Sequence, residues 1–199
     1  MIKAILFDFD GVLTIDKTGS QSIIKYLARI TGISIDLLEK EYYKYNEELL
    51  YGKITHKDMW QSFCDTLGTS IEYDTLIDAF RNTPIDSEMI DLVKEFKKVK
   101  KIGMITDNKR DRIDEVLGFN KLRPLFDVVS VSADYHSGKE ERLIFDKTIS
   151  ALSVKPEQCV FIDNTENNLV IPQRMGMHTI LFDDENRSIA ALKRELLAL

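Results

Sequence analysis

Hydrophobic residues along the chain gather in short uninterrupted runs, and most of these runs are followed by a segment whose apolar positions recur every three or four residues. A short apolar run bounded by turn residues is typical of a strand buried on both faces, whereas the longer spacing is typical of a helix with one buried face. The predicted strands cover Lys3–Phe7, Ile102–Ile105, Val128–Val131, Cys159–Ile162 and Thr179–Phe182.

Helical patterns separate the last four predicted strands, and another helical pattern closes the chain. Parallel strands require crossover connections of this kind, which are usually helices. The alternation therefore predicts an α/β protein with a doubly wound parallel sheet. The predicted helices cover Arg110–Leu117, Glu141–Leu152, Asn167–Met175 and Arg187–Leu197.

Residues 17–84 interrupt this alternation, because they show helical periodicity but no convincing strand. Within them, Thr55 is placed to cap a helix that Gly68 would end. The total of 199 residues suits one domain with an insertion. We therefore predict an α/β core formed by residues 1–16 and 85–199, with residues 17–84 inserted as a helical cap.

Composition narrows the class of protein and its partners. The chain is 44% hydrophobic and 30% charged, as in ordinary globular proteins. A net charge of -6 argues against binding to nucleic acid or to an anionic membrane. Cys64 and Cys159 both lie in apolar patterns, which favours a reducing compartment over a disulfide framework. No stretch reaches membrane-spanning length. We expect a cytoplasmic monomer or homodimer that acts on a small molecule.

Two carboxylates directly follow the first predicted strand. Asp8 and Asp10 are two positions apart, so an extended chain would direct both side chains to the same face, and Gly11 allows a sharp turn after them. One carboxylate can attack a substrate while the other transfers protons, which is an arrangement suited to phosphoryl transfer. Taken alone, the motif would also fit an ordinary strand end followed by solvated turn residues.

Polar clusters after three other predicted strands favour the first interpretation. Thr106 and Asp107 follow the second strand, where a hydroxyl and backbone amides could hold phosphate or cap the next helix. Lys139 follows the third strand, and its ammonium would offset the repulsion between carboxylates and phosphate. Asp163 and Asn164 end the fourth strand, with oxygens that suit Mg²⁺, although Asn164 could also serve as a helix cap. Strand carboxyl ends are where α/β sheets bind ligands.

The order of these motifs resembles the haloacid dehalogenase-like hydrolase superfamily over almost the whole chain. The matching features are DFDGVLT, the threonine of IT, the isolated lysine, FIDNTENN and the helical insert after the first motif. The resemblance implies a Rossmann-like core with a helical cap. Tyr51–Thr55 and Phe161–Met177 look closest to the branch that contains the phosphatase domain of soluble epoxide hydrolases and small sugar-phosphate phosphatases.

The resemblance also implies residue roles. Asp8 matches the nucleophile that forms an aspartyl-phosphate, and Asp10 matches the general acid and base. Thr106 and Lys139 match the residues that hold the phosphate and orient the nucleophile. Gly11 and Asp107, which adjoin these motifs, complete the phosphate-binding set that we expect.

The resemblance further implies Mg²⁺, held by the Asp8 carboxylate, the Asp10 backbone carbonyl and the Asp163–Asn164 cluster. Relatives usually have two acidic residues in that cluster, and the neutral Asn164 removes one unit of charge attraction. We expect weakened but usable Mg²⁺ binding. Two other departures are Glu140, where relatives usually have Pro, and Pro172, which we expect to kink its helix.

The leading functional hypothesis is a Mg²⁺-dependent phosphomonoester hydrolase acting on a small phosphorylated metabolite through an aspartyl-phosphate. The alternatives are a phosphomutase, a haloacid dehalogenase, or a binding or regulatory homologue with weakened catalysis. A carboxylate at Asp10 argues against dehalogenation, which needs no protonation of a leaving group. Lys17, Tyr45 and Lys53 are candidates for substrate contact, and the three histidines are expected to be structural.

Overall fold

A computed structural model describes residues 1–199 and contains one sheet of five parallel strands in the order β3-β2-β1-β4-β5. The chain starts in the central strand, adds strands on one side, and then crosses to the other side. The predicted doubly wound sheet is therefore confirmed. The strands are β1 (Ala4–Phe7), β2 (Lys101–Thr106), β3 (Val128–Val131), β4 (Cys159–Asp163) and β5 (His178–Leu181), so most bounds differ slightly from those predicted.

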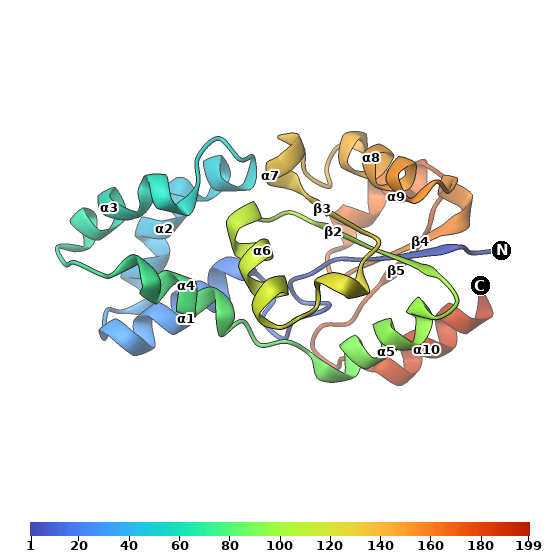
Figure 1. Ribbon diagram of the computed structural model, residues 1–199, viewed down its shortest axis with the longest axis horizontal. Helices are drawn as coiled ribbons and strands as arrows, with labels where there is room; N and C mark the ends of the chain where they lie inside the picture. Colours follow the sequence, from blue (N-terminus) through green and yellow to red (C-terminus); the bar gives the residue numbers. More distant parts are fainter.

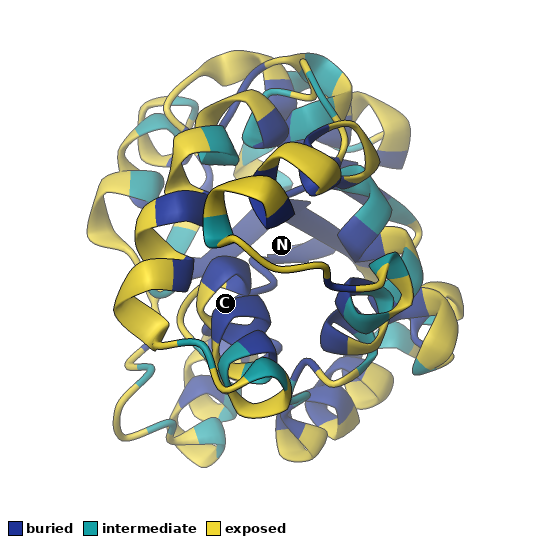
Figure 2. Ribbon diagram, turned by 90° about the vertical axis from the view of Figure 1, so that its left-hand side faces the viewer, coloured by how far each residue is buried: buried dark blue, intermediate teal, exposed yellow.

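Helices cover both faces of the sheet (Figure 1). On one face, α5 (Ser87–Lys97) and α10 (Ile189–Ala198) pack beside each other, and on the other lie α8 (Arg142–Leu152) and α9 (Val170–Arg174). Side chains of β1 alternate between the two hydrophobic clusters beneath these helices. Figure 2 shows the resulting layers, with buried strands inside and exposed outer helix faces. None of the helices has the length and apolarity needed to cross a bilayer.

Four helices stand apart from the sheet at one end of the molecule, on the left of Figure 1. Thr55 caps the third of them with a reciprocal capping box, and Gly68 ends it in a left-handed conformation, as predicted. Their inner faces extend the larger hydrophobic cluster of the core. The helices are α1 (Gly19–Thr31), α2 (Ile35–Leu50), α3 (His56–Leu67) and α4 (Tyr73–Arg81).

Two chain segments that lie side by side connect these four helices to the sheet. Thr14 and Ile85 form an isolated antiparallel bridge. The Ile15 amide donates to the Pro84 carbonyl over 2.8 Å, and the Asp86 amide donates to the Leu13 carbonyl over 3.0 Å. The two connections, residues 13–19 and 83–86, therefore leave the core together, and we call them the hinge segments.

The region after β4 differs from its prediction. Instead of one helix over residues 167–175, the chain forms a 3-10 helix, η3 (Glu166–Leu169), followed by α9. Pro172 is the third residue of α9, where a missing backbone N–H breaks no intrahelical bond. The change of helix type therefore precedes Pro172, and the proline lies in the first turn of the second helix and does not kink it.

Two of the remaining helices pack against the four-helix segment, and two short 3-10 helices precede strands. The helix α6 (Arg110–Phe119) follows β2 and packs against α4, while the short α7 (Ser132–Tyr135) follows β3 and contacts α2. The 3-10 helices η1 (Arg123–Leu125) and η2 (Pro156–Gln158) precede β3 and β4.

Candidate active site

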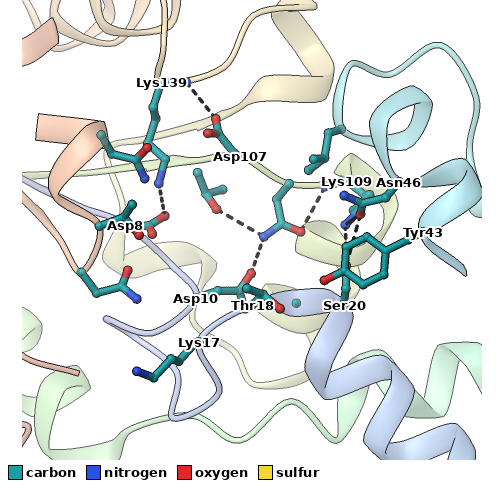
Figure 3. A pocket seen from close by; sticks show the side chains of 17 residues that line it. Asp8, Asp10, Lys17, Thr18, Ser20, Tyr43, Asn46, Asp107, Lys109 and Lys139 are labelled. Carbon is teal, nitrogen blue, oxygen red and sulfur yellow. Dashed lines mark hydrogen bonds and ion pairs between the residues drawn. The ribbon is translucent and has the colours of Figure 1, made fainter. Parts of the chain in front are cut away.

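A polar cavity of about 190 Å³ opens where the carboxyl ends of the strands face the four-helix segment. Core residues at or after the ends of β1, β2, β3 and β4 line one side, and residues of α1 and α2 line the other (Figure 3). Few of the lining side chains are hydrophobic, Leu50 being one of them. The cavity therefore suits a small polar ligand.

Lys139 joins the ends of two neighbouring strands. Its Nζ lies 3.0 Å from Asp8 Oδ1 and 2.7 Å from Asp163 Oδ2, and all three side chains are buried. Burial alone would lower the pKa of Lys139, but the nearby carboxylates of Asp8, Asp163 and Asp107 outweigh it and raise the pKa. Lys139 is therefore a fixed cation at the edge of the cavity, and Figure 3 shows its side chain next to Asp8.

Asp8 borders the cavity in an environment that disfavours its charge. Burial raises its pKa to about 8; Lys139 opposes this rise, while Asp163 and Asp10 add to it. A carboxylate must be ionised to act as a nucleophile. Additional positive charge beside Asp8 would favour that ionised form.

Asp10 is held by a buried arginine that the sequence prediction did not include. Arg112 donates from Nη1 to Asp10 Oδ2 over 2.9 Å and from Nη2 to Oδ1 over 2.8 Å. Asn108 Nδ2 donates to Asp10 Oδ2 over 2.6 Å and also contacts Thr106 Oγ1 at 3.2 Å. Because Asn108 bonds both side chains, the end of β2 is tied to the loop after β1.

The turn after Asp10 depends on glycine. Gly11 has a φ of 79°, in the left-handed region, and the side chain of Asn164 lies directly against it. A Cβ at this position would clash with the Asn164 amide. Gly11 thus allows the fourth strand end to approach the loop, and the Asn164 amide donates to Asp184 Oδ2 over 2.9 Å.

The oxygens present fit a magnesium ion, although not through a cluster of acidic side chains. No group of three or more His, Cys, Asp or Glu side chains is arranged to hold a metal. However, burial raises the pKa of Asp8 even with Lys139 beside it, the Asp10 backbone carbonyl accepts no hydrogen bond, and Asn164 directs only its amide N–H₂ to Asp184. Carboxylate, carbonyl and amide oxygens are ligands that Mg²⁺ accepts.

A second buried lysine lies on the other side of the cavity, next to the four-helix segment (Figure 3). Lys109 Nζ donates to Asn46 Oδ1 over 2.8 Å and to Ser20 Oγ over 3.2 Å. Burial lowers its pKa to about 7, and the positive charge of Arg112 acts in the same direction. Lys109 therefore links the core to α1 and α2 through neutral acceptors.

The structure brings most predicted site residues together. The cavity is lined by Asp8, Asp10, Thr106, Asp107, Lys139 and Asn164. Asp163 lies beneath it with no exposed surface, accepting bonds from Lys139, the Thr165 amide and Asn168. Of the proposed substrate-contact residues, only Lys17 lines the cavity. Tyr45 packs against the hydrophobic cluster, and Lys53 lines a separate surface depression.

The buried histidine has the structural surroundings that were expected. His56 lies outside the cavity, with Nδ1 2.9 Å from Asp111 Oδ2 and Nε2 2.7 Å from the Tyr42 hydroxyl. Burial lowers the pKa of His56. The contacts join α2 and α3 to α6.

Sequence reasoning missed Asn108, Lys109 and Arg112 as site residues. A usable signal was present for Arg112, because it shares the buried face of α6 with Ile113 and Val116. A charged residue on an apolar helix face is rarely buried without a partner. That rule indicates a buried acidic partner but does not identify it as Asp10.

The chain matches the family description of haloacid dehalogenase-like hydrolases over residues 2–176. It therefore belongs to this family of hydrolases. Pyrophosphatase PpaX from Bacillus cereus (strain Q1) is 25% identical over 186 residues, which cover 89% of this chain and 82% of that protein. PpaX from Bacillus cereus (strain ATCC 10987 / NRS 248) is 31% identical over 88 residues, covering 44% of this chain and only 41% of that protein's length.

Solved structures share the fold. A HAD-like family hydrolase from Porphyromonas gingivalis has a TM-score of 0.76 at 21% identity, covering 98% of both chains. A HAD family enzyme from Bacteroides thetaiotaomicron, in complex with magnesium and inorganic phosphate, has a TM-score of 0.76 at 18% identity, covering 96% of this chain and 99% of that chain. L-2-haloacid dehalogenase from Xanthobacter autotrophicus has a TM-score of 0.67 at 18% identity, covering 100% and 83%. The expected epoxide hydrolase branch stays a prediction.

Proposed function

We propose that this hydrolase cleaves phosphomonoesters of small metabolites through an aspartyl-phosphate on Asp8, with residues 17–84 acting as a cap over the site. One observation carries the proposal: Asp8 Oδ1 lies 3.0 Å from Lys139 Nζ in a polar cavity. The carboxylate of Asp10, two residues further along the chain, borders the same cavity. The phosphatase names of relatives and the magnesium and phosphate bound to a structural neighbour support the same class.

In the first step, an Asp8 oxygen attacks phosphorus and the bond from phosphorus to the ester oxygen breaks. The leaving alkoxide takes a proton from Asp10. In the second step, water attacks phosphorus and gives a proton to Asp10, and the Asp8 carboxylate leaves with the bonding electrons. Inorganic phosphate is released, and both carboxyl groups return to their starting forms.

Cations and hydrogen-bond donors would hold the phosphate during both steps. Lys139 would neutralise charge on the phosphate oxygens while it orients Asp8, and the Thr106 hydroxyl and the Asp107 backbone amide would donate hydrogen bonds. Bound Mg²⁺, held by Asp8, the Asp10 carbonyl and Asn164, would offset the negative charge on the transferring group and favour the ionised form of Asp8.

The presence of Asp10 favours a phosphatase over a dehalogenase. Halide ions leave without a proton, whereas an alkoxide needs one, and the carboxyl group of Asp10 borders the cavity beside Asp8. The direct test is phosphate release from an aryl phosphate with and without Mg²⁺. Wild type should show Mg²⁺-stimulated release, and Asp8→Asn should abolish it. Asp91→Asn, which changes an exposed carboxylate on α5, should have no effect. Equal rates in wild type and Asp8→Asn would remove the proposed nucleophile.

A further inference from the structure

Arg112 is a buried charged side chain for which the reaction steps above assign no role. It has no exposed surface. Its guanidinium lies over the ring of Phe9 at 5.6 Å and bonds Asp10 with two parallel N–H donors. A planar guanidinium matched to a carboxylate in this way fixes orientation as well as charge.

The hydrogen bonds leave one defined position on Asp10 where a proton can be accepted. Oδ2 receives bonds from Arg112 Nη1 and from Asn108 Nδ2, whereas Oδ1 receives only the bond from Arg112 Nη2. Each carboxylate oxygen has two lone pairs. Oδ2 is therefore fully occupied, and the remaining lone pair is on Oδ1, in a residue that borders the cavity.

One nitrogen of the Arg112 guanidinium makes no hydrogen bond. Its Nε is buried and has no hydrogen-bond partner. Buried donors are normally satisfied, and an unpaired one in a native fold calls for an explanation. The guanidinium is oriented so that Nη1 and Nη2 both bond Asp10, and this orientation leaves Nε without an acceptor.

Arg112 also contacts both connections to the cap. A Cβ on Gly19, at the start of α1, would clash with the Nη1 and Cζ atoms of the guanidinium. On the returning connection, Thr83 Oγ1 lies 3.4 Å from Nη2. The guanidinium is thus enclosed by both hinge segments, and a shift of either segment changes the space that holds it.

We propose that Arg112 is a positioning residue that fixes Oδ1 of Asp10 as the acceptor of the proton from the hydrolytic water and makes this orientation depend on the cap hinge. The proposal rests on the phosphatase function proposed above. It concerns the second step, in which the water oxygen bonds to phosphorus, the bond from phosphorus to Asp8 breaks, and the water proton goes to Oδ1.

An aryl phosphate with an acidic phenol separates the two steps. Nitrophenolate leaves without a proton, so phosphorylation of Asp8 does not need Asp10, whereas hydrolysis of the intermediate does. Arg112→Met should lower kcat for p-nitrophenyl phosphate by about 30-fold, less than the roughly 100-fold or more that a positioned base contributes, because the Asp10 carboxylate itself is retained. Because kcat/KM reports the first step, it should change less than about two-fold, and KM should fall with kcat. Rapid mixing should show a burst of nitrophenolate.

Two controls isolate the contact with Asp10. Arg110→Met removes a neighbouring arginine of α6 that pairs with Asp134 and Asp114 outside the cavity, and it should leave both constants unchanged. In an Asp10→Asn background, Arg112→Met should have almost no additional effect, because residues that act as one unit are not additive.

Two milder variants keep the test valid if Arg112→Met does not fold. Gly19→Ala introduces a good helix former at the first position of α1 and retains every charge, yet displaces the guanidinium. It should lower kcat less than Arg112→Met does, and it should also leave kcat/KM nearly unchanged. Arg112→Lys keeps the positive charge without the two-pronged contact, and it should recover part of the lost kcat.

The outcomes are distinct. A burst with lowered kcat and preserved kcat/KM supports the proposal. A parallel loss of kcat and kcat/KM without a burst, or a further loss in the Asp10→Asn background, overturns it while the phosphatase function stands. If wild-type protein releases no phosphate from the substrate with Mg²⁺, the proposed function fails and this inference fails with it.

Discussion

Two lysines flank the same cavity, are almost equally buried, and differ in the charge that their surroundings favour. Lys139 is 2% exposed and Lys109 is 4% exposed. Carboxylates surround the first and raise its pKa, whereas burial among neutral acceptors, with Arg112 close by, lowers the pKa of the second to about 7. Burial costs both ammonium groups hydration, so the difference comes from their partners.

This contrast divides the site into two halves. On the Lys139 side, one cation is shared among carboxylates, which suits the binding and transfer of a charged phosphoryl group. On the Lys109 side, hydroxyl and amide oxygens of Ser20 and Asn46 make the contacts with the four-helix segment. We therefore expect substitutions of the two lysines to affect different properties.

The largest effect is expected at Lys139. Lys139→Met leaves Asp8 and Asp163 buried without their cation. It should lower turnover by about 1000-fold, as removal of a strong electrostatic contact does, and lower the free energy of unfolding by about 3–5 kcal/mol. Kinetics with an aryl phosphate and urea unfolding measure the two quantities. Lys147→Met, at an exposed position on α8, is the matched control. Near-normal turnover in Lys139→Met would contradict the assigned role.

A smaller effect should follow when negative charge is added to the Lys139 side. Asn164→Asp should lower the Mg²⁺ concentration for half-maximal activity by about 10-fold, since one unit of attraction is gained. The new carboxylate would also face Asp184, which Asn164 contacts at 2.9 Å. Without metal, the variant should therefore have a lower melting temperature than wild type, and added Mg²⁺ should raise this temperature back to the wild-type value. An unchanged Mg²⁺ dependence in both assays would show that Asn164 does not contact the metal.

The smallest effect on turnover is expected at Lys109, where substitution changes the pH dependence of stability instead. Its pKa is lowered from 10.5 to about 7 in the folded protein. Between these values the unfolded chain holds a proton that the folded chain has released, so the free energy of unfolding rises with pH across this interval. Lys109→Met should remove this rise. Asn46→Asp, which places a carboxylate next to Nζ, should reduce it by making Lys109 resemble Lys139.

Urea unfolding at intervals between pH 7 and 10 would measure the slopes. The contribution is at most about 1.4 kcal/mol per pKa unit. Equal slopes in wild type, Lys109→Met and Asn46→Asp would show that Lys109 is protonated in the folded protein, and the contrast with Lys139 would then be wrong.

The two halves of the site also differ in how far the sequence predicted them. Asp8, Thr106 and Lys139 could be located because each follows a recognisable apolar strand, and parallel strands bring their ends to one edge. The helical nature of residues 17–84 followed from periodicity in the same way. These inferences use patterns that extend over only a few neighbouring residues, together with the rule that the carboxyl ends of parallel strands lie at one edge of the sheet.

The Arg112 and Lys109 contacts could not be predicted in this way. Arg112 reaches Asp10 across 102 positions of sequence, and Lys109 reaches Asn46 across 63. Both contacts depend on how α6 lies against the loop after β1 and against α1 and α2, which is set by packing between elements. The shape of the loop that brings Asn164 against Gly11 likewise depends on the tertiary contact.

Mass spectrometry of the acid-quenched reaction tests the central claim most directly. Wild-type protein mixed with substrate and Mg²⁺ should gain one phosphoryl group, located by peptide mapping at Asp8, and Arg112→Met should accumulate more of it. A phosphoryl group on another residue, or an equally phosphorylated Asp8→Asn protein, would contradict the account.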